Sequence, residues 1–157
     1  MDDSQDEKYC LCETVKVLYK KERKIIILVD DNSMEKFDNL LWSFEQNSFI
    51  PHKIYQDDDK VDAPVLIMSD LPDISLEPLK KYSTIINDTN NALVTLKNDV
   101  VIYEFVGHDE NRKNISREKY MKYKSNKFEL THNTAYWCCS VGFLEKNDAD
   151  NVKTRFE

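Results

Sequence analysis

Basic residues concentrate in one short segment of an otherwise acidic chain. Residues 111–127 contain seven Lys or Arg and one acidic residue, Glu118, so the segment carries a charge of +6. The whole chain of 157 residues has a net charge of -7, which leaves -13 on the remainder. Four cations and one aromatic ring recur at helical spacing: Lys113, Arg117, Tyr120, Lys124 and Lys127. These residues would share one face of a helix predicted over 114–127.

Such a face could bind an acidic peptide that ends in an apolar group. Arg makes bidentate contacts with carboxylates, and a Tyr ring offers stacking area. Two alternatives stay open on spacing alone. The segment could be a solvated helix with Tyr120 or Tyr123 turned into the core. It could also bind single-stranded nucleic acid directly, with Tyr120 and Tyr123 stacking on bases.

A second candidate site is aromatic. Trp42 lies at the end of a predicted helix, and Phe49, Pro51 and His52 follow after a short turn. Large aromatic side chains of this kind are typical of the hot spots of protein interfaces. They could equally belong to the core.

Catalytic signals are weak. Asp30 and Asp31 follow a predicted strand, where a carboxylate pair could bind a metal ion in an α/β hydrolase, but such pairs also end strands and cap helices. The histidines, His52, His108 and His132, have no Cys or Ser in a recognisable nucleophile elbow near them. No group of residues meets the combined requirements for nucleophile, base and oxyanion stabilisation, so we expect a noncatalytic protein.

The amino-acid composition disfavours several kinds of protein and binding site. The four cysteines form the close pairs 10/12 and 138/139, which lack zinc-knuckle spacing, so reduced thiols in the cytoplasm are expected. Only two glycines occur, which disfavours a phosphate-binding loop, and we expect no metal and no cofactor. No apolar run of about 18 residues is present, and the acidic N-terminus has no secretory signal pattern.

Helical and strand patterns alternate along the chain. Helices are predicted over 9–22, from Asn32 to residue 44 with a capping box formed by Asn32 and Glu35, over 90–96 and over 114–127. Extended segments are predicted over 24–29, 49–52, 63–68, 83–87 and 100–106. This order favours a sheet with crossover helices.

Several segments resemble one family when they are taken together. They are DNLLWSF at 38–44, SFIPH at 48–52, APVLI at 63–67, REKYMKY at 117–123, FEL at 128–130 and NTAYW at 133–137. In this order they resemble the chi subunit of bacterial DNA polymerase III, over residues 11–137. The resemblance implies a Rossmann-like three-layer α/β domain with a mostly parallel sheet and no nucleotide chemistry.

The resemblance also implies an organisation of the chain. Residues 9–137 would form the chi-like domain, preceded by a polar remnant at 1–8 and followed by a polar tail at 138–157. Family members usually begin with a strand before the first helix. This chain starts almost at that helix, so the first family strand is expected to be missing.

The function implied is that of an accessory subunit in DNA replication. Chi proteins pair with the psi subunit of the clamp loader and hold the acidic C-terminal tail of single-stranded-DNA-binding protein, so contact with DNA would be indirect. Trp42 and Phe49 match the family's psi contacts. The residues that match or extend its tail-binding site are Val106, Lys113, Arg117, Tyr120 and Lys124. Met121 stands where the family is often basic, and Lys122 and Lys124 could compensate for it.

Overall fold

The computed structural model describes residues 3–43, 49–56, 61–72, 74, 79–94, 100–106, 110–126, 128, 130–134 and 142–146. The chain divides into two compact units. The first unit comprises residues 12–88, and the second comprises residues 89–157 together with residues 1–11. Each unit is described by itself.

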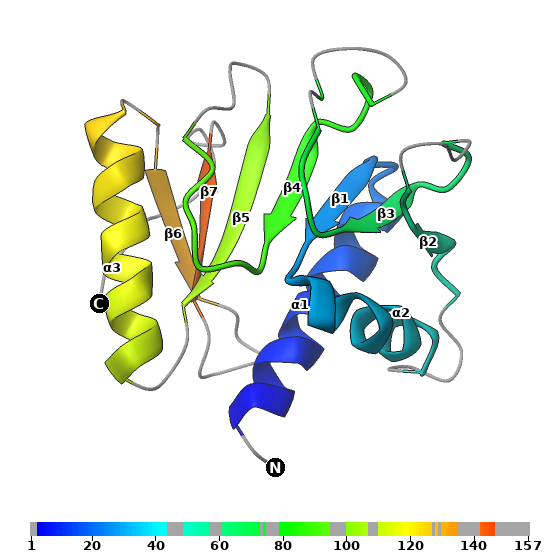
Figure 1. Ribbon diagram of the computed structural model, residues 1–157, viewed down its shortest axis with the longest axis horizontal. Helices are drawn as coiled ribbons and strands as arrows, with labels where there is room; N and C mark the ends of the chain where they lie inside the picture. Colours follow the sequence, from blue (N-terminus) through cyan, green and yellow to red (C-terminus); the bar gives the residue numbers. More distant parts are fainter. Residues whose placement is uncertain are drawn as a thin grey trace. The chain divides into compact units, whose positions relative to one another are not determined.

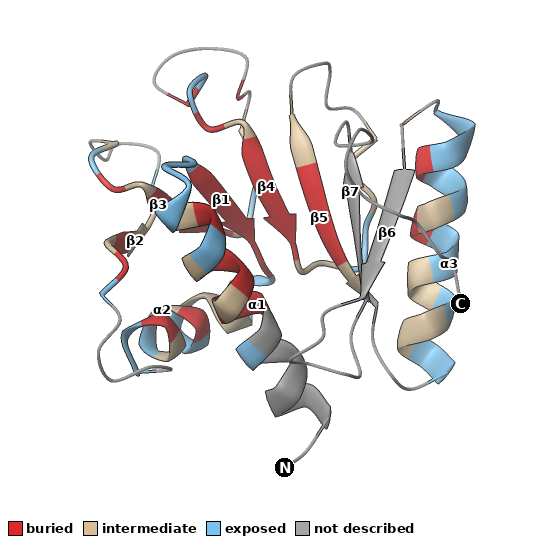
Figure 2. Ribbon diagram, turned by 180° about the vertical axis from the view of Figure 1, so that it is seen from behind, coloured by how far each residue is buried: buried red, intermediate tan, exposed pale blue. Residues whose placement is uncertain are grey.

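The first unit contains a parallel sheet of four strands, in the order β2-β3-β1-β4 (Figure 1). They are β1 (Ile25–Leu28), β2 (His52–Ile54), β3 (Val65–Met68) and β4 (Thr84–Asn87). β1 pairs in parallel with both β3 and β4, so that Ile26 lies opposite Leu66 on one side and Ile85 on the other. Every residue of β1, β3 and β4 is buried, as Figure 2 shows for the strands in red. Continuous apolar runs form such strands because both faces of the sheet are covered.

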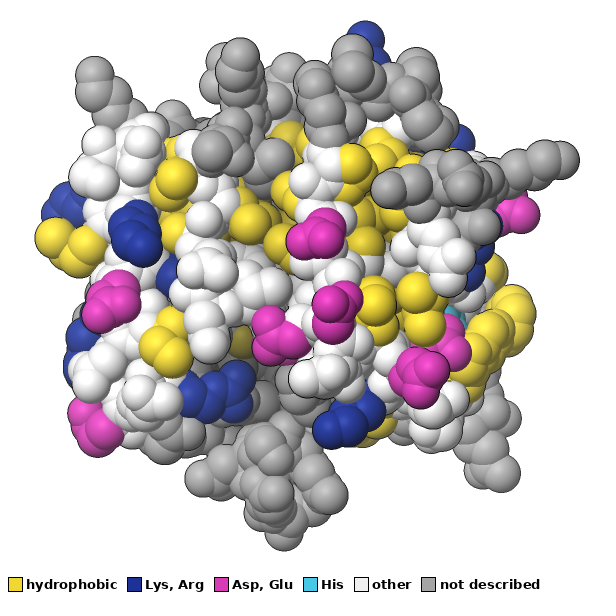
Figure 3. Space-filling model, viewed as in Figure 1, with side chains coloured by type: hydrophobic (Ala, Val, Ile, Leu, Met, Phe, Trp, Pro, Cys, Tyr) yellow, Lys and Arg dark blue, Asp and Glu magenta, His cyan; other side chains and the backbone are white. Residues whose placement is uncertain are grey.

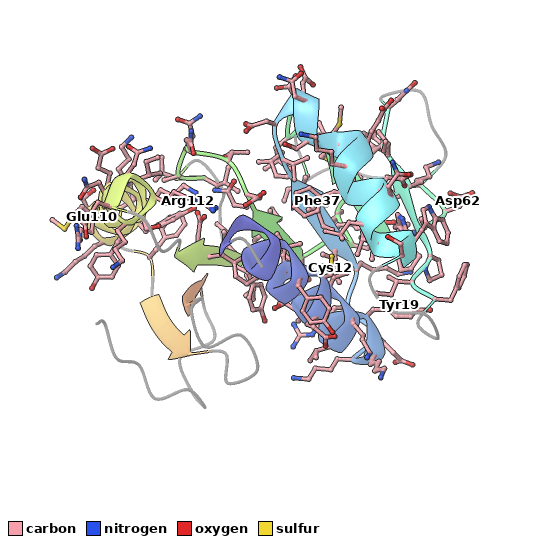
Figure 4. All side chains as sticks on the ribbon, turned by 90° about the horizontal axis from the view of Figure 1, so that it is seen from below. Cys12, Tyr19, Phe37, Asp62, Glu110 and Arg112 are labelled. Atoms are coloured by element: carbon pink, nitrogen blue, oxygen red, sulfur yellow. The ribbon has the colours of Figure 1, made fainter. Side chains whose placement is uncertain are left out.

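Helices cover both faces of this sheet. α1 (Asp3–Lys20) precedes β1, and a 3-10 turn, η1 (Asp31–Ser33), leads into α2 (Met34–Ser43). Figure 4 shows α1 and α2 on opposite sides of the strands, with Cys12 and Phe37 pointing inward. Both side chains are fully buried, as is Val15 one turn further along α1. The predicted α/β class with a mostly parallel sheet is therefore confirmed.

Besides the first half of α1, the described residues of the second unit form three strands and one helix. They are β5 (Val101–Val106), α3 (Glu110–Ser125), β6 (Leu130–Thr134) and β7 (Gly142–Lys146). The strand order is β5-β7-β6, and both pairings are antiparallel. Leu144 of β7 lies opposite Glu104 of β5 and His132 of β6. α3 runs alongside these strands (Figure 1).

Several boundaries differ from those expected. α1 begins at Asp3, so residues expected as a polar remnant belong to its first turns, and β1 is the first strand among the described residues. α3 begins at Glu110, one turn earlier than expected. The expected tail at 138–157 contains β7, because pairing with β5 and β6 forms a strand that local composition does not indicate. Within the predicted helix at 90–96, the described residues 90–94 are not helical, and residues 95 and 96 lie outside the described part.

The predicted capping box is wrong. Asn32 lies inside η1, and Asp30, which precedes this turn, makes no side-chain capping hydrogen bond. The extra 3-10 turn moves the start of α2 to Met34. Of the helices in the described ranges, none has the length and apolar character needed to cross a membrane.

Candidate protein-binding surfaces

The predicted basic stripe lies along one flank of α3, between its buried side and its most exposed side. Arg117 and Lys124 are exposed, whereas Lys113 and Tyr120 are half-buried. We call these four residues the basic face. Lys127 lies outside the described residues, as does the side chain of Val106 at the end of β5. Figure 3 shows Lys and Arg side chains gathered over this helix.

Contacts within the basic face leave its charges available to a ligand. The ammonium of Lys124 lies 5.9 Å from the centroid of the Tyr120 ring, within the range of a cation–π contact. Arg117 donates a hydrogen bond of 2.8 Å to Asn114 Oδ1 and lies 4.0 Å from Glu110 Oε2. Both members of this ion pair are largely exposed, so it contributes little and an incoming carboxylate can replace it.

The adjacent, buried side of α3 is anchored by a polar network. Lys119 Nζ lies 2.8 Å from Glu104 Oε1, and the Tyr123 hydroxyl donates to Glu104 Oε2 at 2.5 Å. The same hydroxyl accepts a hydrogen bond of 3.0 Å from the backbone N–H of Leu93. The network connects α3 to β5 and to the segment before it. It therefore fixes which side of α3 faces outward.

This network was missed by the sequence analysis, which counted Lys119 among the charges of the segment. One signal was present: Glu104 is the one charged residue in the otherwise apolar or aromatic strand β5. Burial of Tyr123, 2% exposed, also removes it as a stacking platform for bases. The interpretation that turns Tyr123 into the core is thus correct for this ring, while Tyr120 stays on the basic face.

Two further residues of α3 modify the basic face. Met121 is 61% exposed and lies four residues after Arg117, so it adds an apolar side chain to the edge of the face. Arg112 is half-buried, and its burial lowers the pKa of its guanidinium. The guanidinium nevertheless stays charged in proteins at neutral pH.

The second surface is formed by Trp42 and Phe49 in the first unit. Trp42 is 47% exposed and Phe49 is 67% exposed, so the assignment of these rings to the core is wrong. Their ring centroids lie 5.3 Å apart with the planes tilted by 41°. We call this pair the aromatic surface. Figure 3 shows hydrophobic side chains exposed over the region of α2 and β2.

The buried His52 ring packs against Trp42 of the aromatic surface. Its ring centroid lies 4.2 Å from that of Trp42, and its side chain is fully buried. Nδ1 lies 2.6 Å from the carbonyl oxygen of Ile50. Nε2 lies 3.1 Å from the carbonyl oxygen of Asp38 and 3.3 Å from its carboxylate. The ring thereby connects the start of β2 to the middle of α2.

The acidic pair considered for metal binding does not form a larger cluster. Asp30 and Asp31 are both exposed at the end of β1. Across the described ranges, no three His, Cys, Asp or Glu residues come together as metal ligands would. Cys12 is fully buried in α1. His108 and the side chain of His132 lie outside the described part of the chain.

Fold and surfaces together define an α/β protein with one charged and one aromatic surface available to other molecules. The sequence model of the family "DNA polymerase III chi subunit, HolC" matches residues 2–131. The chain is also 24% identical over 136 residues to DNA polymerase III subunit chi of Escherichia coli strain K12, covering 81% of this chain and 83% of that protein. The chain belongs to the DNA polymerase III chi subunit family. The expected place in DNA replication, as an accessory subunit of this polymerase, is confirmed at the level of the family.

Proposed function

We propose that this chain is a noncatalytic adaptor that bridges the psi subunit of the clamp loader to the acidic C-terminal tail of single-stranded-DNA-binding protein. The observation that carries the proposal is the basic face of α3. Within a chain of net charge -7, it presents exposed cations beside a tyrosine ring. An acidic protein with one local basic stripe is better suited to a short acidic peptide than to nucleic acid.

Each residue of the basic face has a role in this capture. Lys113 and Arg117 take carboxylates, Arg117 by a bidentate contact. The Tyr120 ring packs against the apolar end group of the peptide, and Lys124 adds charge above the ring. Val106 would add an apolar wall.

The test is calorimetric titration of the protein with a short acidic peptide that ends in Asp-Phe with a free carboxylate. We expect a dissociation constant in the micromolar range, which corresponds to a binding free energy of about -8 kcal/mol. Arg117→Ala should weaken binding by about tenfold, the effect of losing one charge-assisted contact. Lys122→Ala is the matched control, because Lys122 is exposed but lies on another side of α3. Equal losses in both variants would mean that general charge, not this face, attracts the peptide.

The aromatic surface is proposed to dock psi. Two exposed aromatic rings in mutual contact provide the anchor that interface hot spots require. Trp42→Ala should weaken psi binding by at least about tenfold, that is, by more than about 1.4 kcal/mol. Val17→Ala, which removes another exposed apolar side chain, should leave it unchanged. Unaltered psi binding in Trp42→Ala would refute this assignment.

Direct binding of single-stranded nucleic acid is the second candidate, because the same basic face could follow a phosphate backbone. Titration with a bare oligonucleotide distinguishes direct nucleic-acid binding from capture of an acidic peptide. Affinity that falls steeply as salt is raised would favour this candidate, whereas no binding at low salt would exclude it.

A further inference from the structure

The aromatic surface adjoins a row of carboxylates on the same helix. Glu35 and Asp38 precede Trp42 by seven and four residues, which is the spacing of one helical face, and Asp31 lies about one turn further back in η1. Asp31 and Glu35 are exposed, and 29% of the Asp38 side chain is exposed. We call these three acidic residues the acidic edge. Figure 3 shows acidic side chains beside exposed hydrophobic ones over α2.

One buried side chain connects the acidic edge to the aromatic surface. The Asp38 carboxylate lies 3.3 Å from Nε2 of His52, and the centroid of the same imidazole ring lies 4.2 Å from that of Trp42. Phe49 continues the apolar area, since its ring centroid lies 5.3 Å from that of Trp42. A partner that covers the two exposed rings therefore also meets negative charge.

Other charges of the same elements leave the acidic edge negative. In the described part of the chain, neither Asp31 nor Glu35 forms an ion pair. Lys36 follows Glu35 directly, so it lies about 100° away from it around α2. Lys53 of β2 lies 3.3 Å from the Asp62 carboxylate. The positive end of the helix dipole accounts for acidic residues in a first turn, but not for one in the middle of a helix.

We propose that the aromatic surface and the acidic edge together bind a basic, apolar segment of psi. An apolar side chain of this segment packs on Trp42 and Phe49, and its Lys or Arg side chains pair with the carboxylates. On a helical segment these cations lie about 6 Å and about 10 Å along the axis from the apolar side chain, which is the rise from Trp42 to Asp38 and Glu35. This inference rests on the proposed function for the identity of the partner.

The two binding surfaces of the chain then select partners of opposite charge. The basic face of α3 attracts an acidic peptide that ends in an apolar group. The rings of Trp42 and Phe49 could also pack against such an end group, but the acidic edge repels the carboxylates that accompany it. Charge thereby keeps the acidic peptide away from the surface that docks psi.

The first test is calorimetric titration with psi at low salt, with circular dichroism to show that each variant is folded. Glu35→Lys turns an attraction at the rim of the interface into a repulsion, so it should weaken binding about fivefold. Glu118→Lys is the matched control, because it makes the same change of charge at an exposed position of α3, and it should leave psi binding unchanged. Added salt should weaken binding to wild type more than binding to Glu35→Lys.

The outcomes of this titration are distinct. Equal affinities of wild type and Glu35→Lys overturn the inference and leave the docking of psi on the aromatic rings intact. Absence of psi binding to wild type overturns the proposed function, and the second test then decides the inference.

The second test needs no psi. Two synthetic helical peptides share one Leu as the apolar side chain and carry either Lys or Glu four and seven residues away from it. NMR follows the indole N–H signal of Trp42, which Trp42→Phe identifies among the two tryptophans. The Lys peptide should bind at least about tenfold more tightly than the Glu peptide, the effect of two reversed charge pairs. Equal affinities, or no shift with either peptide, overturn the inference.

Discussion

Removal of the buried ammonium of Lys119 should cost the second unit much of its stability. In Lys119→Met the side chain keeps most of its length but leaves Glu104, whose side chain is 4% exposed, without its cation at 2.8 Å. Breaking a buried ion pair on one side costs about 3–5 kcal/mol. The Tyr123 hydroxyl still donates to the same carboxylate in the variant. We therefore expect the free energy of unfolding to fall by about 3 kcal/mol, the lower end of this range. The free energy of unfolding of a domain of this size is typically about 5–15 kcal/mol, so the variant should still fold.

The assay is equilibrium unfolding in guanidinium chloride, followed by circular dichroism. Lys122→Met is the matched control, since Lys122 is exposed on the same helix, and it should stay within about 0.5 kcal/mol of wild type. Adding Glu104→Gln to Lys119→Met should recover part of the loss, because the buried carboxylate that has lost the Lys119 cation is then replaced by a neutral amide. A loss below about 1 kcal/mol in Lys119→Met, equal to that of the control, would refute the reasoning that the pair anchors α3.

Three shorter predictions concern the core, a tyrosine and the basic face. Ile26→Ala, at a fully buried position of β1, should lower the free energy of unfolding by about 3 kcal/mol in denaturant titration. Burial and then the charge of Asp62 raise the pKa of Tyr82 above its ordinary value of 10.0, and its hydroxyl donates to the Ala63 carbonyl. Its contribution to stability should therefore be complete below about pH 10 and be lost at higher pH, and Tyr82→Phe should remove this dependence in unfolding curves at alkaline pH. Met121→Lys should raise the affinity for the acidic peptide about twofold to threefold in calorimetry, by one added exposed charge.

The parallel sheet could be predicted from the sequence because its strands are encoded locally. β1 and β3 are runs of β-branched and other apolar residues, which form strands buried on both faces wherever they pair. The basic face could also be predicted, because helical spacing alone brings Arg117 and Lys124 to one side.

Features that depend on distant residues could not be predicted in this way. Lys119 is no different in sequence from the exposed lysines around it, and only Glu104, fifteen residues earlier, makes it a buried residue. β6, most of whose residues are polar, becomes a strand by pairing with β7, and β7 in turn pairs with β5. The exposure of Trp42 and Phe49 is likewise decided by how α2 packs and not by the residue types.

The strand order β5-β7-β6 has a consequence for synthesis of the protein. β7 is the last of the described strands in the chain, yet it lies between the other two and pairs with both. During translation, β5 and β6 therefore emerge from the ribosome before the strand that joins them. Until residues 142–146 follow, the edges that β7 will cover have open backbone hydrogen-bonding groups, which are prone to pair with other nascent chains. The second unit should therefore be exposed to wrong strand pairing, and depend on chaperones, until β7 has been made.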